Sequence, residues 1–386
     1  MPVERTGALL VAWSREQLDR FPAIRANAEA CGYRRVAEIP VEELYRREPA
    51  LGGGALGALE VPDEFIVCPW TPPLAFATQA VLAGATLRRG ERVTGLARRG
   101  DAWAIDTSAG RLTSGWVVNA AGLRSDEVDR MAGGGGFTVV PRRGELIVFD
   151  KLSRGLVRHV LLPVPTATTK GVLIAPTVFG NVMLGPTAVD VEDKDDTAST
   201  ADGLARLWSD GRRLMPSLLE HEVTAVYAGL RAATEHADYQ LEAHPERRYV
   251  CAGGIRSTGL SAAMAIAEWV RDELDAAGVE LRERRPLPEV RMPNIGEASL
   301  RPYADPVRIA WDPAFGEIAC YCERVTRGEI RDAARSAIPA LDLDGLRRRT
   351  RALTGRCQGF FCGASVARQL ASATGREVGE LWERPR

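Results

Sequence analysis

The sequence predicts a mixed α/β and α+β protein with two domains joined by a proline-rich segment. Short apolar stretches typical of strands alternate with helical stretches over residues 85–278. Six prolines then crowd residues 285–316, and four of the seven cysteines follow them. A chain of 386 residues is long enough for each domain to bury a core of its own.

The larger domain is expected to occupy residues 1–284. Residues 14–50 read as helical, with breaks at Pro40 and Pro49. Short strands are expected at 85–87, 92–97, 102–106 and 116–120, and an antiparallel set over about 140–235. A helix is expected over 201–214, within that set.

One unit of this domain joins a strand, a glycine-rich loop and a helix. The apolar strand Tyr249–Ala252 leads into the loop 253–260, and a helix is expected over 261–277. A helix N-terminus behind a glycine-rich loop is a ready site for an anion or a cofactor. A tight turn that only packs the helix on its strand is the alternative interpretation.

Composition narrows the function classes. The formal net charge of −1 gives no reason to expect a nucleic acid or an anionic membrane surface as partner. No apolar run approaches the roughly 18–20 residues of a membrane span, and the N-terminus lacks the features of a signal peptide. We therefore expect a cytoplasmic protein. The alternative is a peripheral protein that partners attach to the inner face of the membrane.

The smaller domain, residues 317–386, is built around two close cysteine pairs. The proline-rich segment before it is expected to be a semi-rigid linker without regular elements. Cys320-Tyr-Cys322 is followed, after 34 residues, by Cys357-Gln-Gly-Phe-Phe-Cys362. Soft thiolates suit an iron–sulfur cluster, and the Cys-x-Cys pair fits zinc-site spacing poorly. A zinc site and four unrelated buried thiols stay open as alternatives. Helices are expected over 327–337, capped by Thr326, and over 364–374.

The stretches 320–330, 349–351 and 355–362 closely resemble the bacterioferritin-associated-ferredoxin-like (BFD-like) [2Fe–2S] domain. More narrowly, they resemble the version fused to flavoproteins similar to the flavin-binding subunit of glycerol-3-phosphate dehydrogenase. The resemblance implies that Cys320, Cys322, Cys357 and Cys362 bind a [2Fe–2S] cluster. Phe360 stands where the family usually has a second glycine.

The larger domain resembles the D-amino-acid-oxidase-like (DAO) superfamily. Val117-Val-Asn-Ala-Ala-Gly122 is similar to its strand and turn beneath FAD, Tyr227–Tyr239 to a substrate-domain strand, and Cys251–Leu260 to its C-terminal flavin loop. The resemblance implies FAD as a cofactor. The residues expected to bind it are Asn119, Ala121, Gly122, Gly253, Gly254, Ile255, Ser257, Gly259 and Leu260.

Three further residues are candidates for the substrate site. Arg231 and Arg256 each carry a guanidinium that matches a carboxylate or a phosphate, so a small anionic substrate is expected. An ordinary surface ion pair is the alternative for both. His236 is a candidate general base for a substrate hydroxyl, and an exposed histidine without a role is the alternative.

The dinucleotide-binding fingerprint of the family is missing. A strand, a G-x-G-x-x-G turn and a helix would form the cradle for the adenosine diphosphate. The literal match Gly52–Gly57 follows Pro49 rather than a strand, and is expected to be a plain turn. A misassigned start, a truncation or a separate polypeptide would each explain this. We expect the chain alone to bind FAD weakly or not at all.

Together these features predict an FAD-dependent dehydrogenase fold lacking its N-terminal βαβ unit. The expected reaction is oxidation of a small hydroxy acid or polyol phosphate, with glycerol 3-phosphate as first candidate. Electrons would pass through the cluster to a redox partner subunit or a quinone-linked acceptor. The rival hypothesis is a non-catalytic remnant or electron-transfer subunit. Several arginines of the smaller domain would dock an acidic partner or simply be solvated, namely Arg347, Arg348, Arg349, Arg351 and Arg356.

Overall fold

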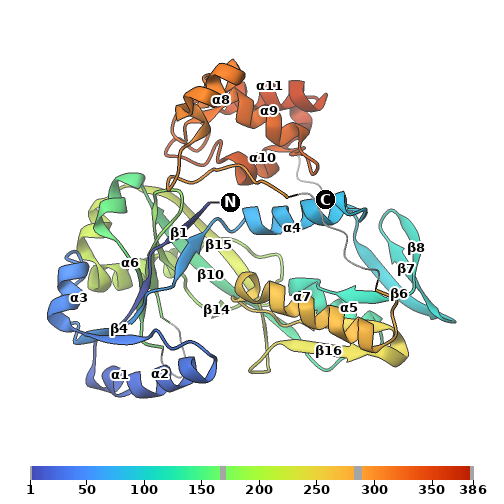
Figure 1. Cartoon of the computed structure of the whole chain (residues 1–386), viewed down its shortest axis with the longest axis horizontal. Coiled ribbons are helices and arrows are strands. Elements are labelled where there is room, and N and C mark those ends of the chain that lie inside the picture. Colours follow the sequence, from blue (N-terminus) through green and yellow to red (C-terminus); the bar gives the residue numbers. More distant parts are fainter. Residues whose placement is uncertain (1, 166–170, 282–288, 383–386) are drawn as a thin grey trace.

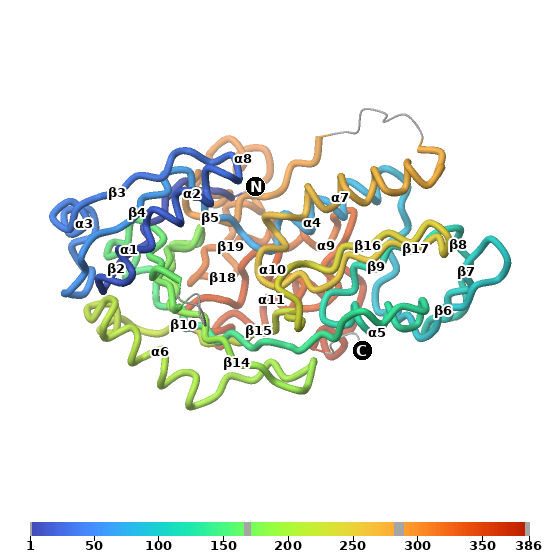
Figure 2. The backbone as a smooth tube through the Cα atoms, turned by 90° about the horizontal axis from the view of Figure 1, so that it is seen from below, coloured from blue at the N-terminus to red at the C-terminus, as the bar shows by residue number. Residues whose placement is uncertain are grey.

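The computed structural model describes residues 2–165, 171–281 and 289–382. Two lobes lie side by side, and the C-terminal helices sit above them (Figure 1). The molecule is elongated, with α3 (Val41–Arg47) at one end of its long axis and β7 (Ala102–Thr107) at the other (Figure 2). A mixed α/β architecture with open sheets confirms the predicted fold class.

The first lobe is organised around a nine-stranded sheet. Its strand order is β14-β10-β13-β12-β11-β2-β4-β3, with β15 paired to β10. Among the described strands of this sheet, only β2 and β11 pair in parallel, so the antiparallel sheet expected over about 140–235 is present. Because its predicted role is to bind substrate, this lobe is called the substrate lobe and its sheet the substrate sheet below. The strands are β2 (Ala8–Ala12), β3 (Ala37–Pro40), β4 (Gly57–Val61), β10 (Val139–Phe149), β11 (Val160–Pro163), β12 (Leu173–Pro176), β13 (Val182–Gly185), β14 (Val189–Asp190) and β15 (Val223–Thr234).

The core of this lobe lies between the sheet and α6 (Ala201–Leu214). Leu207 and Leu214, on one face of α6, pack among Ile147, Phe149 and Leu184 of the sheet. The helix expected over 201–214 is confirmed by α6, and Thr200 caps it by accepting a hydrogen bond from the Gly203 amide. The helices α1 (Arg15–Asp19) and α2 (Phe21–Ala30) complete the lobe, together with α3.

The second lobe contains two three-stranded sheets. In one, β17 (Tyr249–Gly253) lies between β16 (Gln240–His244) and β9 (Val117–Asn119), so that β16 and β9 are its two edge strands. The other joins β6 (Val93–Arg99), β7 and β8 (Gly110–Ser114). Trp103, Phe137 and Tyr249 form the core.

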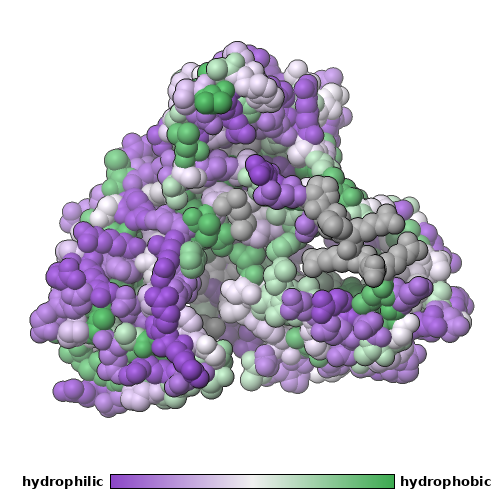
Figure 3. Space-filling view, in the orientation of Figure 1, coloured by the Kyte–Doolittle hydropathy of each residue, from purple (hydrophilic) through white to green (hydrophobic). Residues whose placement is uncertain are grey.

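Two helices of this region expose apolar surface. No residue of α7 (Gly259–Ala276) is buried, and Leu260 and Met264 are exposed. On α4 (Thr71–Leu82), Phe76 and Leu82 are exposed as well. In the space-filling view, hydrophobic residues gather in the hollow between the lobes, while hydrophilic residues cover their outer faces (Figure 3).

The C-terminal module is small and mostly helical, as predicted. A short hairpin of β18 (Ile318–Cys320) and β19 (Val325–Thr326) precedes α9 (Arg327–Arg335), α10 (Leu343–Thr350) and α11 (Gly363–Thr374). Val325, Ile330, Leu346, Val366 and Leu370 are fully buried between these helices. Thr326 caps α9, and Glu329 completes a capping box with it.

The proline-rich segment is not free of regular elements, which corrects the prediction. Short helical turns occur at η5 (Pro302–Ala304), α8 (Pro306–Trp311) and η6 (Pro313–Phe315). Each begins at a proline, where the missing N–H would have no partner within the helix and the fixed φ favours helix entry. Pro286 and Pro288 lie outside the described residues.

Two secondary-structure predictions near the N-terminus were also wrong. Residues 14–50 are not uniformly helical, because Ala37–Pro40 forms β3. Residues 85–87 form no strand. The pairing of β3 with β4 joins segments about twenty residues apart, which a local pattern does not reveal. Among the described residues, none of the helices combines the length and apolar character needed to cross a membrane.

Candidate functional site

The four predicted cysteines come together at one end of the C-terminal module. Cys320 ends β18, Cys322 follows two residues later, and Cys362 caps α11 from the opposite loop. Their thiols meet in two pairs, Cys322 with Cys357 and Cys320 with Cys362. The first pair is the more exposed, while Cys320 and Cys362 are buried.

This arrangement fits a two-iron cluster. An apolar pocket of about 270 Å³ is lined by three of the cysteines together with Tyr321 and Phe361. In a [2Fe–2S] cluster each iron is bound by two thiolates, and the two ligand loops provide the four thiolates that this requires.

The loop around Cys357 favours a thiolate. A hydrogen bond from the Phe361 amide, then one from the Cys322 thiol, and then those from the Gly359 and Cys362 amides hold the pKa of Cys357 below its ordinary value against the effect of burial. Burial raises the pKa of Cys362 to about 12. Amides directed at sulfur are the usual outer partners of cluster thiolates, so this loop is suited to hold a negatively charged centre.

The predicted flavin residues gather where two parallel strands end. β9 and β17 pair in register, with Asn119 opposite Cys251. Ala121 and Gly122 follow β9, and the loop from Gly254 follows β17, so both turns lie at the same edge of the sheet. The carboxyl edge of parallel strands is the usual place for a cofactor in α/β proteins.

Two of these residues have internal packing roles. The Asn119 amide donates to the Ser125 carbonyl (2.8 Å) and to the Tyr249 hydroxyl (2.9 Å), so its side chain fixes the turn from within. A Cβ at Gly253 would stand 2.7 Å from the Phe137 ring. Gly254 has a φ of +62°, which favours glycine. These contacts support the packing interpretation of the loop alongside the cofactor interpretation.

The loop also offers an open helix terminus. Thr258, the N-cap of α7, makes no side-chain hydrogen bond to the first turn. Ser257 and Leu260 are exposed, while Ile255 lies beneath Gly259. The N-terminus of an 18-residue helix carries partial positive charge, which fits the electron-rich edge of a reduced flavin ring.

The fingerprint that would bind the adenosine diphosphate part of FAD is not found among the described residues. Gly52–Gly57, the literal fingerprint match, lies in a turn between α3 and β4, where Gly52 packs against the Arg213 and Leu214 carbonyls. It is therefore a plain turn, as predicted.

Arg231 lies on β15, apart from the flavin loop. Its guanidinium donates to the Thr187 carbonyl at 3.3 Å and covers Gly144. Burial, and then the charge of Arg142, lowers the pKa of Arg231. Within the part of the chain that the structure describes, no carboxylate pairs with it. A half-buried cation without an anion is a candidate for binding an anionic ligand.

Arg256 and His236 lie together. The Arg256 guanidinium donates to the carbonyls of Thr234 (3.2 Å) and His236, and no carboxylate pairs with it among the described residues. His236 Nε2 lies 3.0 Å from the Gly136 carbonyl. If Nε2 donates there, Nδ1 is the basic nitrogen. No described contact joins this pair to Arg231, so the roles of the three residues stay predictions.

One further group at the site was not indicated by any pattern in the sequence. Lys151, after β10, pairs with Glu323, the residue that follows Cys322. The two residues are far apart in the chain, and each alone resembles any surface charge. Because their contact depends on the packing of distant segments, no local pattern in the sequence could have predicted it.

Comparison with known proteins finds two family models that match separate parts of the chain. The family model described as FAD dependent oxidoreductase (DAO) matches residues 1–273, and the BFD-like [2Fe-2S] binding domain matches residues 318–372. A glycerol 3-phosphate dehydrogenase of Caloramator mitchellensis is 31% identical over 384 residues, covering 99% of this chain and 80% of that protein.

Two further comparisons agree. One subunit of the anaerobic glycerol-3-phosphate dehydrogenase of Escherichia coli K12 is 25% identical, covering 95% of this chain and 73% of that one. The FAD-bound L-alpha-glycerophosphate oxidase of Mycoplasma pneumoniae has the same fold, with a TM-score of 0.67 at 24% identity over 71% of this chain and 74% of that one. The chain therefore belongs to the FAD-dependent oxidoreductase (DAO) family and carries a BFD-like [2Fe–2S] binding domain.

Proposed function

We propose that this chain is the substrate- and cluster-binding part of an FAD-dependent dehydrogenase for a small anionic hydroxy compound. Glycerol 3-phosphate is the first candidate, because several relatives are named for it. Hydroxy acids form the wider class, since an L-2-hydroxyglutarate dehydrogenase of Indibacter alkaliphilus is 30% identical over 193 residues, 49% of this chain and 48% of that one.

The reaction divides between the cofactors and the chain. Oxidation of a secondary alcohol to a ketone removes a hydride from carbon and a proton from the hydroxyl. FAD, when bound, supplies the hydride acceptor, and the cluster supplies a one-electron carrier. An oxidase that reduces oxygen has no need of such a carrier, so a dehydrogenase is favoured.

The chain's own residues would bind and orient the substrate. Arg231 and Arg256 lack carboxylate partners among the described residues, and each would hold the anionic group. His236 would accept the hydroxyl proton at Nδ1. The open N-terminus of α7 would favour the negative charge of the reduced ring.

Contact between the cluster loop and the substrate sheet is the observation that carries this proposal. Gln358 Nε2 donates to the Thr224 carbonyl of β15 at 3.2 Å. Arg356 Nη2 pairs with Asp150, just after β10 (3.3 Å), and with Glu222, just before β15 (3.0 Å). The cluster loop thus lies against β10 and β15, and β15 carries Arg231.

The test is anaerobic spectroscopy of the full chain supplied with iron, sulfide and FAD. We expect broad charge-transfer absorption that bleaches with dithionite, and cluster reduction when glycerol 3-phosphate is added. Cys362→Ser should lose the cluster signal, while Cys31→Ser, at an exposed position outside the module, should keep it. A featureless spectrum with bound zinc would overturn the cluster and the electron-transfer role.

One observation favours a second candidate, an electron-transfer subunit without catalysis of its own. It is the missing cradle for adenosine diphosphate among the described residues. In that case dithionite would reduce the cluster, and no hydroxy substrate would do so even with excess FAD.

The electron acceptor is proposed to be a redox partner subunit or a quinone-linked protein. The Escherichia coli relative is itself named as one subunit of a dehydrogenase. Tyr321, Phe360 and Phe361 expose aromatic surface beside the cysteines, which suits contact with such a protein. Attachment to the membrane's inner face would then depend on this partner.

A further inference from the structure

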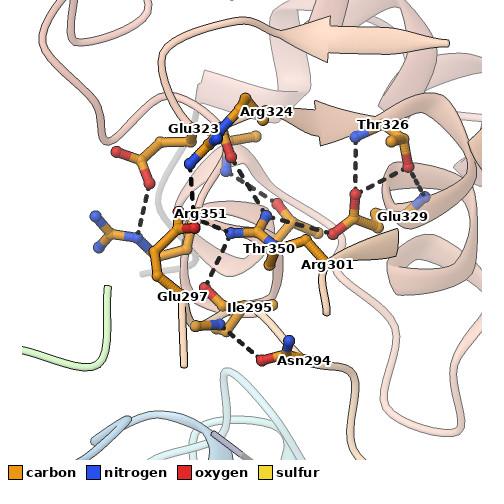
Figure 4. A network of polar contacts seen from close by, with 12 residues as sticks. Asn294, Ile295, Glu297, Arg301, Glu323, Arg324, Thr326, Glu329, Thr350 and Arg351 are labelled. Atoms are coloured by element: carbon orange, nitrogen blue, oxygen red, sulfur yellow. Dashed lines mark hydrogen bonds and ion pairs between the residues drawn. The ribbon is translucent and has the colours of Figure 1, made fainter. Parts of the chain in front are cut away.

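A network of ion pairs and hydrogen bonds joins the proline-rich segment to the C-terminal module and includes Glu323 (Figure 4). Glu323 is the residue that follows Cys322, and its side chain is only 2% exposed. A buried carboxylate must be paired, because its desolvation is otherwise strongly unfavourable. The partners of Glu323 come from three separate parts of the chain.

The first partner of Glu323 is Lys151, which lies outside the C-terminal module. Lys151 Nζ, in the short helical turn after β10, lies 3.2 Å from Glu323 Oε2. The same ammonium lies 2.8 Å from Glu297 Oε1 of the proline-rich segment. Lys151 therefore ties the substrate lobe both to that segment and to the cluster loop.

The second partner comes from the other ligand loop. Arg351 Nε, six residues before Cys357, lies 3.3 Å from the same Glu323 oxygen. Its guanidinium carbon lies 4.0 Å from the ring centre of Phe179 in the substrate lobe. A Cβ at Gly355 would stand 2.4 Å from the Cys322 Cβ and 3.0 Å from Glu323 Oε1, so the two ligand loops touch here.

The third partner fixes the backbone. Arg301, 3% exposed, donates from Nη2 to the Glu323 carbonyl at 3.3 Å and pairs with Glu297 at 3.5 Å. It also lies 3.7 Å from Glu329 in the first turn of α9. The side chain and the carbonyl of Glu323 are both held, so the position of Cys322 is set by contacts from three directions.

We propose that Glu323 is a positioning residue for the iron–sulfur centre, holding the two ligand loops together and joining them through Lys151 to the substrate lobe. The role rests on the proposed [2Fe–2S] function of the four cysteines. An outer partner of this kind fixes the ligand geometry and limits access of water and chelators, without touching the metal itself.

The test compares full-length variants reconstituted with iron and sulfide. In Glu323→Gln the cluster should form, and a chelator should then remove its iron on the order of tenfold faster than from the parent protein. The midpoint potential should rise, because the lost negative charge leaves Arg351 without its carboxylate partner beside the centre, while Lys151 keeps only Glu297. Glu317→Gln is the matched control, since this carboxylate is exposed and pairs with exposed Arg327 in the same module.

A second pair of variants tests the connection between the lobes. Lys151→Met should accelerate iron loss, and Lys151→Arg should keep the parent rate because it retains the positive charge. This pair also gives the answer if Glu323→Gln does not fold. A loss rate and potential equal to those of Glu317→Gln would overturn the positioning role alone. A parent protein that takes up no iron and sulfide would overturn the cluster, and the proposal with it.

Discussion

Arg231 and Arg142 lie opposite each other on β15 and β10 but have different surroundings. Arg142 pairs with Asp190 at 2.9 Å, whereas Arg231 donates to the Thr187 carbonyl. We expect Arg231→Ala to raise KM for glycerol 3-phosphate roughly 10–100-fold, since a lost charged hydrogen bond is worth about 1.5–3 kcal/mol. Arg142→Ala, the cross-strand control, should change KM little. Equal effects in steady-state assays of the flavin-loaded protein would remove the binding role of Arg231.

The buried carboxylate of Asp126 should make the stability of the folded protein depend on pH. Burial would raise its pKa, but the ammonium of Lys194 at 2.6 Å, the Val139 amide and Arg130 hold the pKa below the ordinary value. The unfolded chain then binds more protons in acid. The contribution of Asp126 to the free energy of unfolding is therefore complete above the pKa of an ordinary aspartate, about 3.9. It is lost as the pH falls through the lower pKa that Asp126 has in the folded protein.

Thermal unfolding between about pH 6 and 3 checks this expectation. The Tm of the parent protein should fall toward the acid end, and Asp126→Asn should flatten that fall while lowering the Tm near neutrality. Asp195→Asn, at a side chain 76% exposed, serves as the control and should keep the parent profile. A parallel fall in Asp126→Asn would show that other groups cause the acid sensitivity.

At the scale of elements, the capping box of α9 links the cysteine hairpin to the helical core. Thr326 Oγ accepts from the Glu329 amide (3.2 Å), and Glu329 Oε2 accepts from the Thr326 amide (2.9 Å). Thr326→Ala should destabilise the C-terminal module by about 1–2 kcal/mol, and Thr326→Ser should keep most of the stability. Hydrogen exchange of the α9 amides in the full chain measures this. Equal protection in both variants would contradict the role of the cap.

The sequence predicted those features that depend on neighbouring residues. The Thr326 cap and the Gly253–Gly254 turn each depend on residues within a few positions. The same holds for the close spacing of Cys320 with Cys322 and of Cys357 with Cys362. Features that depend on distant contacts were missed or wrong. β3 needs its pairing with β4, and the Lys151–Glu323 contact needs the packing of two lobes. The proline turns were missed because proline was read as a breaker, although at a first helical position it favours the helix.

At the scale of the whole molecule, the Gly253–Leu260 loop and the C-terminal module both contact β15, while the second lobe leaves β9 as an edge strand and α7 without a buried residue. The described residues therefore include the loop predicted to bind the flavin ring, and not the fingerprint expected to bind its adenosine diphosphate. Without that fingerprint, the adenosine half should add little to binding.

We expect the chain alone to bind FAD and FMN with similar, weak affinity, because both share the ring that the Gly253–Leu260 loop is predicted to bind. Fluorescence titration with each flavin measures the ratio, which should lie near one. Gly254→Val should weaken both equally, since a β-branched side chain is strained at a φ of +62°. The control Gly100→Val, also at positive φ but in a hairpin turn away from the loop, should leave both unchanged. A stoichiometric FAD complex, or binding of FAD that is much tighter than that of FMN, would show that residues of this chain hold the adenosine half after all.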